Sequence, residues 1–197
     1  MRTFKQMEMG IDKELLSLCI QKDRKAQFEL YRQSYSILMS VCLRYEKNKE
    51  DATSLLNLGF LKVLSNLEKY SQEAPFEAWI RRIMINTIID EFRKNRKQKE
   101  LIEYNDLSED RGTNVQISYN DADQRFDAEE LQQMLTRLPV LSQKVFNLHV
   151  IDGYSHKEIG KMLDMSDGTS KWHVSFARKK LRGMIAETMK KLPTILL

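Results

Sequence analysis

Apolar residues recur at helical spacing along most of the chain. From about position 12 to 97 they fall three or four residues apart, which places their side chains on one face of an α-helix. The breaks in this pattern lie near residues 22–23, 46–51 and 71–75. The residues that set the pattern are Leu15, Leu18, Cys19, Phe28, Tyr31, Tyr35, Leu38, Cys42, Leu55, Leu58, Leu61, Leu64, Phe76, Trp79, Ile80, Ile83 and Ile88.

The middle of the chain loses this spacing. Residues 101–125 have weak periodicity and many Asp, Asn, Ser and Gly residues, which predicts a flexible linker. Helical spacing resumes at Leu131, is broken at Pro139 and returns from Val140 onward. Because no convincing pair of strands or internal repeat is present, the pattern predicts an all-α protein with two small helical domains.

Charge is segregated along the chain, although the net charge is only +4. Residues 81–99 carry seven Lys and Arg against two carboxylates, and residues 171–191 carry seven against one. Between them, residues 100–130 carry ten Asp and Glu against two Arg. Two basic faces on either side of an acidic linker predict two contacts with a polyanion, joined by a segment that avoids it.

Composition argues against several classes of protein. No apolar run reaches the ~18 to 20 residues of a membrane span, and the N-terminus lacks an apolar stretch of signal-peptide type. We therefore expect a cytoplasmic protein that is not inserted in a membrane. Cys19 and Cys42 lie within helical patterns and are predicted to be core thiols. The chain contains no HExxH, CxxC or phosphate-binding glycine loop, so we expect no enzyme activity, metal, cofactor or small-molecule substrate.

One stretch near the C-terminus, SDGTSKWHVSFARKKLR, begins like a helix and ends in basic residues. Upstream, Ser155 is predicted to cap a short helix, and Ser166 is predicted to cap the next one after a tight turn at Asp164. Asp164 stands where glycine is common, but Asp tolerates a left-handed backbone better than most residues do. Two short helices joined by such a turn predict a helix-turn-helix, whose second helix enters the major groove of DNA.

The second of these helices has two faces. Val174, Ala177, Leu181 and Ile185 recur at helical spacing and are expected to pack inward. Lys171 can donate to guanine acceptors, and Trp172 can contact a thymine methyl group. Taken alone, this helix is as consistent with a solvated basic face or a protein-binding anchor as with DNA binding. The residues predicted to reach bases or phosphates of DNA are Thr169, Ser170, Lys171, Trp172, His173, Ser175, Arg178 and Lys179.

Two parts of the chain resemble the extracytoplasmic-function (ECF) group of bacterial RNA polymerase sigma factors. Residues 138–182 are similar to region 4, with the elements LP…Q…VF, G.S..EIG..L, S.GT.K and ARKKLR in order. DATSLLNLGFLKVLSNLEKY and FEAWIRRIMINTIIDEFRKNRK are similar to region 2. The resemblance implies region 2 at residues 12–98, an acidic linker at 99–127 and region 4 at 128–192.

The resemblance also implies a function for each region. Region 2 would bind core RNA polymerase and recognise and melt the −10 promoter element, and region 4 would recognise the −35 element. Asn86 matches the family asparagine that lines a pocket for a flipped-out base, and Trp79, about two turns earlier on the same face, either walls that pocket or belongs to the core. The cations expected to hold phosphates of the melted strand are Arg82, Arg93, Lys94 and Arg96.

The polymerase-binding helix departs from the family pattern. Where relatives show DAEDLVQE, residues 51–58 read DATSLLNL, so carboxylates are missing and asparagine replaces glutamine. The sequence therefore leaves two alternatives open: affinity for core polymerase is weaker than in relatives, or apolar residues of this helix carry it. The residues expected to contact polymerase are Leu55, Asn57, Leu58, Phe60 and Leu61.

The resemblance implies three partners: core RNA polymerase, promoter DNA and an anti-sigma factor. Two other hypotheses remain open at this point. A sigma-like decoy would occupy an anti-sigma factor without engaging polymerase, but it would have no need of promoter-binding cations. A stand-alone helix-turn-helix regulator would have no need of a second basic domain.

Overall fold

The computed structural model describes residues 11–46, 48–100 and 128–191. Within these ranges the regular structure is entirely helical and contains no strand, which confirms the predicted all-α fold. The predicted linker lies outside the described residues, except for its first two positions, which continue a helix. The chain divides into two compact units, Met1–Asn95 and Arg96–Leu197.

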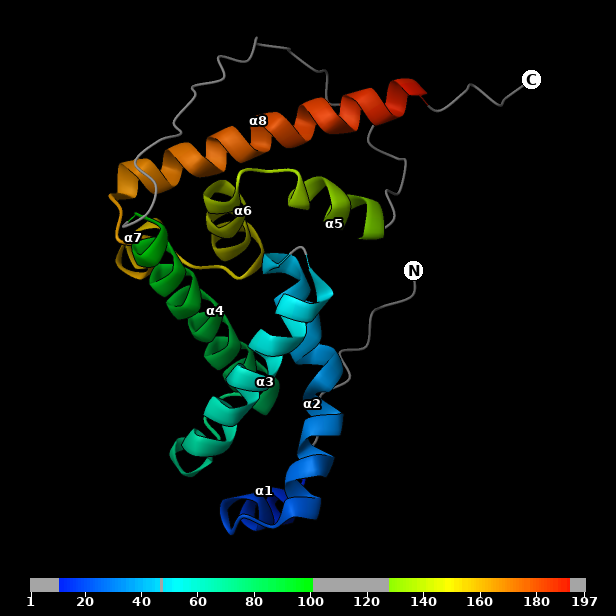
Figure 1. Cartoon of the computed structure of the whole chain (residues 1–197), viewed down its shortest axis with the longest axis vertical. Coiled ribbons are helices and arrows are strands. Elements are labelled where there is room, and N and C mark those ends of the chain that lie inside the picture. The colour runs from blue at the N-terminus through cyan, green and yellow to red at the C-terminus, as the bar shows by residue number, and fades with distance from the viewer. Residues whose placement is uncertain (1–10, 47, 101–127, 192–197) are drawn as a thin grey trace, which may run out of the picture. The chain divides into compact units, whose positions relative to one another are not determined.

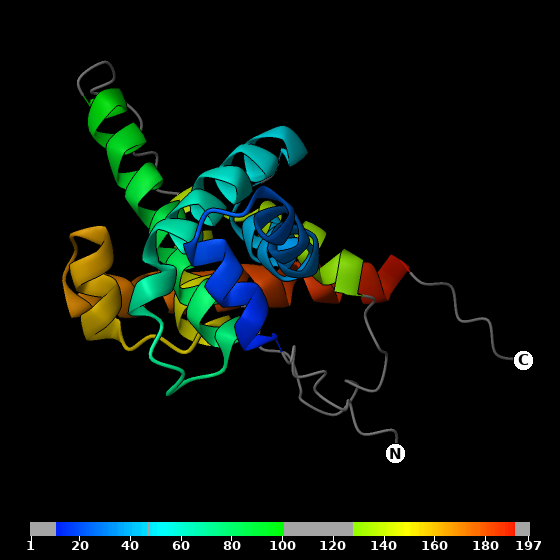
Figure 2. The same ribbon diagram turned by 90° about the horizontal axis from the view of Figure 1, so that it is seen from below.

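The described residues of the first unit form four α-helices. They are α1 (Lys13–Ile20), α2 (Arg24–Tyr45), α3 (Lys49–Asn66) and α4 (Phe76–Glu100), with a short 3₁₀ turn, η1 (Leu67–Lys69), after α3. Helix α2 packs against both α1 and α3, and both views show α2 and α3 side by side (Figures 1 and 2). The side chains of Asp12, Asp23 and Asn48 cap the first three helices, each accepting a hydrogen bond from an N–H of the first turn.

The centre of the core of the first unit is formed by large apolar side chains from α2, α3 and α4. Leu30 and Leu38 of α2, Leu56 of α3, and Ile80 and Met84 of α4 are fully buried. Apolar spacing therefore predicted the helices correctly. Not every apolar residue in these patterns faces the core, however, since Phe28 and Leu61 are exposed.

Both cysteines are buried and unbonded to each other, as predicted for core thiols. Burial raises the pKa of Cys42 to about 12 and also raises that of Cys19. The Sγ atom of Cys42 lies 3.5 Å from Sδ of Met84, which ties α2 to α4 inside the core.

In the part of the second unit that the structure describes, one long helix packs against three short ones. The short helices are α5 (Ala128–Thr136), α6 (Val140–Phe146) and α7 (His156–Leu163), and the long helix is α8 (Asp167–Lys191). A π-helical turn, η3 (Asn147–Ile151), follows α6. Helix α8 contacts α5, α6 and α7, so its inward face holds the unit together.

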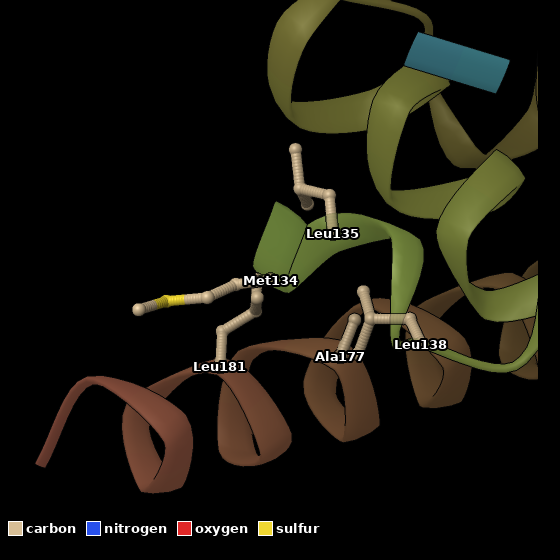
Figure 3. Close-up of a cluster of buried hydrophobic side chains, with 5 residues drawn as sticks. All are labelled: Met134, Leu135, Leu138, Ala177 and Leu181. Atoms are coloured by element: carbon tan, nitrogen blue, oxygen red, sulfur yellow. The ribbon is translucent and has the colours of Figure 1, made fainter. Parts of the chain in front are cut away.

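The apolar cluster between α5 and α8 shows how α8 is seated. Met134, Leu135 and Leu138 meet Ala177 and Leu181, and all five are at most 7% exposed (Figure 3). Partly buried Ile185 packs against the same cluster. The predicted inward stripe of α8 is thus confirmed.

The predicted helix-turn-helix is formed by α7, α8 and the turn between them. Ser155 and Glu158 form a capping box at the start of α7, and Oγ of Ser166 accepts a hydrogen bond from the N–H of Thr169 at 3.0 Å. Asp164 ends α7 in the left-handed region, with φ 55° and ψ 56°. The chain therefore meets the backbone requirement of the turn without glycine, as expected for an aspartate.

Gly160 makes the tight turn possible. A Cβ atom at this position would lie 2.7 Å from the carbonyl oxygen of Met165, on the far side of the turn. The absence of a side chain therefore lets α7 approach the segment that leads into α8. Among the described helices, none is long and apolar enough to cross a membrane.

Replacing Gly160 by alanine is expected to destabilise the second unit by about 1–3 kcal/mol, because the new methyl group overlaps backbone that cannot move without opening the turn. Gly183→Ala is the matched control. It lies within α8 with no atom within 4 Å of its added Cβ, and it is expected to stabilise the helix by about 0.5–1 kcal/mol. Urea denaturation of the full chain measures both changes, and equal stabilisation by both would contradict the close approach.

Candidate nucleic-acid interface

The outward face of α8 presents polar, aromatic and basic side chains to solvent. Trp172 is 58% exposed although it is a large aromatic residue. This face lies opposite the stripe of Val174, Ala177 and Leu181, because residues on an α-helix advance by about 100° each. The predicted DNA-binding residues that are exposed are Thr169, Lys171, Trp172, Ser175, Arg178 and Lys179.

Ser170 is not exposed, and its prediction as a DNA contact on the outward face of α8 was wrong. Its side chain is completely buried, and its Oγ lies 2.9 Å from Nδ1 of His156. Ser170 precedes Val174 by one helical turn and so extends the inward stripe. It joins the first turn of α8 to the first turn of α7 and is not available to DNA.

His173 also turns away from the outward face. Its ring is half-buried, and its Nδ1 lies 2.9 Å from Oγ of Ser142 on α6. Burial lowers the pKa of His173, so its imidazole is neutral at neutral pH. The sequence predicted this residue as a DNA contact, whereas its ring nitrogen is engaged within the protein.

The other two histidines of the chain, His149 of η3 and His156 at the start of α7, contact each other. The rings of His149 and His156 are stacked with centroids 4.1 Å apart, and Nδ1 of His149 lies 2.9 Å from the carbonyl oxygen of Tyr154. Desolvation, helped by His149, Lys171 and Arg178, lowers the pKa of His156, while Asp167 acts in the opposite direction. A neutral His156 ring suits this contact, since its protonation would add positive charge beside Lys171 and Arg178.

In the first unit, the predicted base-pocket residues lie on α4. Asn86 is exposed and is free to present its amide to solvent. Trp79 is half-buried and packs against Phe76 and Tyr70, with ring centroids 5.6 Å and 5.1 Å away. Trp79, Phe76 and Tyr70 therefore form a cluster of three aromatic rings at the start of α4.

Tyr70 was not among the predicted site residues. It lies in the segment before α4, and its hydroxyl donates to the carbonyl oxygen of Ala74 at 2.8 Å. This bond holds the tyrosine ring against Trp79 and Phe76. The sequence shows an aromatic residue between two predicted helices. Helical spacing, however, does not predict which helix a residue outside the helices contacts.

The predicted phosphate-binding cations of α4 are all exposed: Arg82, Arg93, Lys94 and Arg96. Lys94 is paired with Glu91 at 2.6 Å on the same helix. Asp90 pairs with Lys62 of α3 at 3.3 Å and thereby links the two helices. An exposed pair of this kind contributes little to stability, so Lys94 can exchange Glu91 for a phosphate at small cost.

The predicted polymerase-binding residues of α3 divide into two groups. Leu61 is 60% exposed, Asn57 is exposed, and Leu55 and Leu58 are half-buried. Phe60, by contrast, is only 6% exposed and its ring packs edge-on against Tyr31 of α2. Its prediction as a surface contact was wrong, because this position faces the neighbouring helix.

Aromatic residues on α2 extend the exposed apolar surface of α3. The Tyr31 hydroxyl donates to Oδ1 of Asn57 at 3.0 Å, and the ring of Tyr35 lies 5.9 Å from that of Tyr31. Phe28, one turn earlier on α2, is 68% exposed. The sequence shows these three aromatics at helical spacing, but spacing alone does not tell which of them the packing leaves exposed.

Comparison with known proteins identifies the family. The model described as Sigma-70 region 2 matches residues 30–98, and the model described as Sigma-70, region 4 matches residues 128–181. Together these matches cover more than half of the chain. The ECF RNA polymerase sigma factor SigE of Mycolicibacterium smegmatis is 30% identical over 161 residues. The chain belongs to the sigma-70 family of RNA polymerase sigma factors, and this relative is of the ECF group.

Other relatives match over more of their own length. The SigE match spans 81% of this chain but only 61% of that relative. SigM of Mycobacterium tuberculosis is 25% identical, with 88% of this chain and 84% of the relative covered. SigV of Bacillus subtilis is 28% identical, with 86% and 90% covered. A solved complex of the sigma factor RpoE with the anti-sigma factor NepR from Bartonella quintana matches at 15% identity, covering 80% of this chain and 97% of that chain, with a TM-score of 0.48.

The lowered histidine pKa values make the stability of this sigma factor sensitive to mild acid. As pH falls through about 6.5, the ordinary histidine value, the unfolded chain takes up protons more readily than the folded one does. Stability is therefore expected to be full above that pH and to fall below it. The urea midpoint should be lower at about pH 5.5 than at about pH 7.5.

The double variant His156→Gln, His173→Gln is the test of the cause. Carboxylates stay largely ionised across this interval, so removing both imidazoles should reduce the difference between the two urea midpoints. A midpoint difference that is unchanged in the double variant would show that other groups carry the acid sensitivity.

Proposed function

We propose that this protein acts in the cytoplasm as a sigma factor that binds core RNA polymerase and directs promoter-specific initiation of transcription. The observation that carries this proposal is that two compact helical units each expose a basic helix face. One is on α4, with Arg82 and Arg93, and the other is on α8, with Lys171 and Arg178. A stand-alone helix-turn-helix regulator needs only the second of these.

Region 4 would read the −35 element through α8. Its N-terminal turns carry the exposed Lys171 and Trp172, which can contact base edges in the major groove. Arg178 and Lys179 follow further along the helix, where they would contact the phosphate backbone. The buried stripe on the opposite face supports this arrangement, because it fixes which residues can face DNA.

Region 2 would hold a flipped base of the −10 element beside α4. An exposed amide such as that of Asn86 offers both a donor and an acceptor to a base edge. Trp79 lies seven residues earlier, on the same side of the helix, and Tyr70 packs against it. These aromatic rings would provide stacking surfaces for an unstacked base.

The surface for core polymerase would include α3 and the adjoining aromatics of α2. Asn57 and Leu61 are exposed on α3, and Phe28 and Tyr35 are exposed on α2. Apolar area on this surface supports polymerase binding despite the missing carboxylates of the family pattern, since apolar burial drives most protein association. An anti-sigma factor is a further expected partner, on the basis of family membership.

The first test is run-off transcription from fragmented DNA of the source organism with purified core polymerase. Transcripts are expected only when the protein is added, and Asn86→Ala is expected to reduce them about tenfold or more, because a base contact through two hydrogen bonds is lost. Asn95→Ala is the matched control, since it removes the same amide from the opposite side of α4.

Two outcomes would contradict this proposal. Equal losses of transcript for Asn86→Ala and Asn95→Ala would contradict the base pocket proposed at Asn86. If the protein is folded but fails to bind active core polymerase, the result would instead support a sigma-like decoy that occupies an anti-sigma factor.

The second test compares variants of α8 in DNA binding. Lys171→Ala and Trp172→Ala are expected to reduce discrimination between −35 sequences, at about 1–3 kcal/mol for each lost base contact. Lys179→Ala is expected to weaken binding to all sequences alike and to lower the salt dependence of affinity by about one phosphate contact. Titrations at several salt concentrations measure both effects. The same uniform loss for all three variants would contradict the assigned roles.

A further inference from the structure

Trp172 is exposed, yet its ring is held by two neighbours. The indole is stacked on Phe176, one turn further along α8, with ring centroids 5.2 Å apart and an interplanar angle of 18°. The ring of His173 meets it in an edge-on arrangement at 4.9 Å and 78°. Such offset-stacked and edge-on geometries are the favoured arrangements of aromatic pairs.

Both neighbours are themselves fixed. Nδ1 of His173 is bonded to Oγ of Ser142, a buried residue of α6. Nζ of Lys180 lies over the ring of Phe176, 5.8 Å from its centroid. The orientation of Trp172 is therefore coupled to α6 on one side and to the next turn of α8 on the other.

Fixing an exposed tryptophan matters for recognition. A free side chain must give up rotamer freedom when it binds, and this lost entropy weakens binding. A ring already held in one orientation gives up less, and it also presents the same edge to every base pair that it meets. Contact with a thymine methyl then depends on the sequence of the DNA and less on rearrangement of the protein.

We propose that His173 and Phe176 are positioning residues, which hold the Trp172 indole in its DNA-reading orientation without contacting DNA themselves. This proposal rests on the proposed recognition of the −35 element by α8. It gives His173 a different role from the DNA contact predicted from the sequence, and it adds Phe176, which the sequence pattern did not single out.

The ring contact can be tested in the free protein. Fluorotryptophan labelling gives ¹⁹F signals from Trp79 and Trp172, and the signal lost in Trp172→Phe identifies the second. Phe176→Leu is expected to shift the Trp172 signal and leave that of Trp79 unchanged. Phe176→Tyr, which keeps the ring, is expected to restore the wild-type signal. A Trp172 signal that is unaffected by Phe176→Leu would overturn the proposal.

The effect on recognition is measured with a randomised pool of DNA duplexes. For the wild-type protein, the selected duplex and a scrambled one are then compared by titration. Phe176→Leu is expected to lower the preference for the selected duplex by about twofold to tenfold, the scale of one aromatic pair. His173→Ala is expected to do the same. Neither should change affinity for the scrambled duplex or the salt dependence, because neither residue neutralises a phosphate.

Phe146→Leu is the matched control for loss of a ring. Phe146 is a partly buried phenylalanine of the same unit that packs on the α5–α8 cluster, and its loss should leave the sequence preference unchanged. Equal weakening for both duplexes, or a smaller salt dependence, in Phe176→Leu would overturn the proposal in favour of a direct contact with the backbone. A wild-type protein that selects no sequence would overturn the proposed −35 function itself, before any variant is compared.

Discussion

The burial of one face of α8 is the constraint on which the DNA-binding unit depends. Ser170, Val174, Ala177 and Leu181 follow one another at intervals of four, three and four residues, and all are buried. Because α5, α6 and α7 all pack against α8, this stripe fixes the rotation of the helix about its own axis. The exposed residues on the opposite side follow directly, because rotating the helix by one residue, about 100°, would bring Ser175 and Arg178 into the core in place of Val174 and Ala177.

Much of this architecture could be predicted from the sequence. The pattern indicated helices, the two serine caps of the helix-turn-helix and the inward stripe from Val174 to Ile185, because these features depend on local spacing and local hydrogen bonds. Ser170 was misplaced because a polar side chain can extend an apolar stripe once a partner such as His156 satisfies its hydroxyl.

Other features of the site depend on contacts between helices, which spacing does not specify. Where a helix has two adjoining apolar stripes, only the packing decides which stripe is buried. Phe60 lies against Tyr31 for this reason, while Phe28 and Leu61 remain exposed. The contact between Tyr70 and Trp79 likewise requires a loop hydrogen bond, which no helical pattern can indicate.

The buried cysteines restrict how oxidative stress could act on this protein. A thiol reacts with oxidants as the thiolate, and a pKa of about 12 keeps the thiolate population of Cys42 negligible at neutral pH. Cys19, the other cysteine in the sequence, is also buried and has a raised pKa. Burial and raised pKa values therefore protect both thiols of the folded protein from peroxide, so neither cysteine is suited to sensing a redox signal.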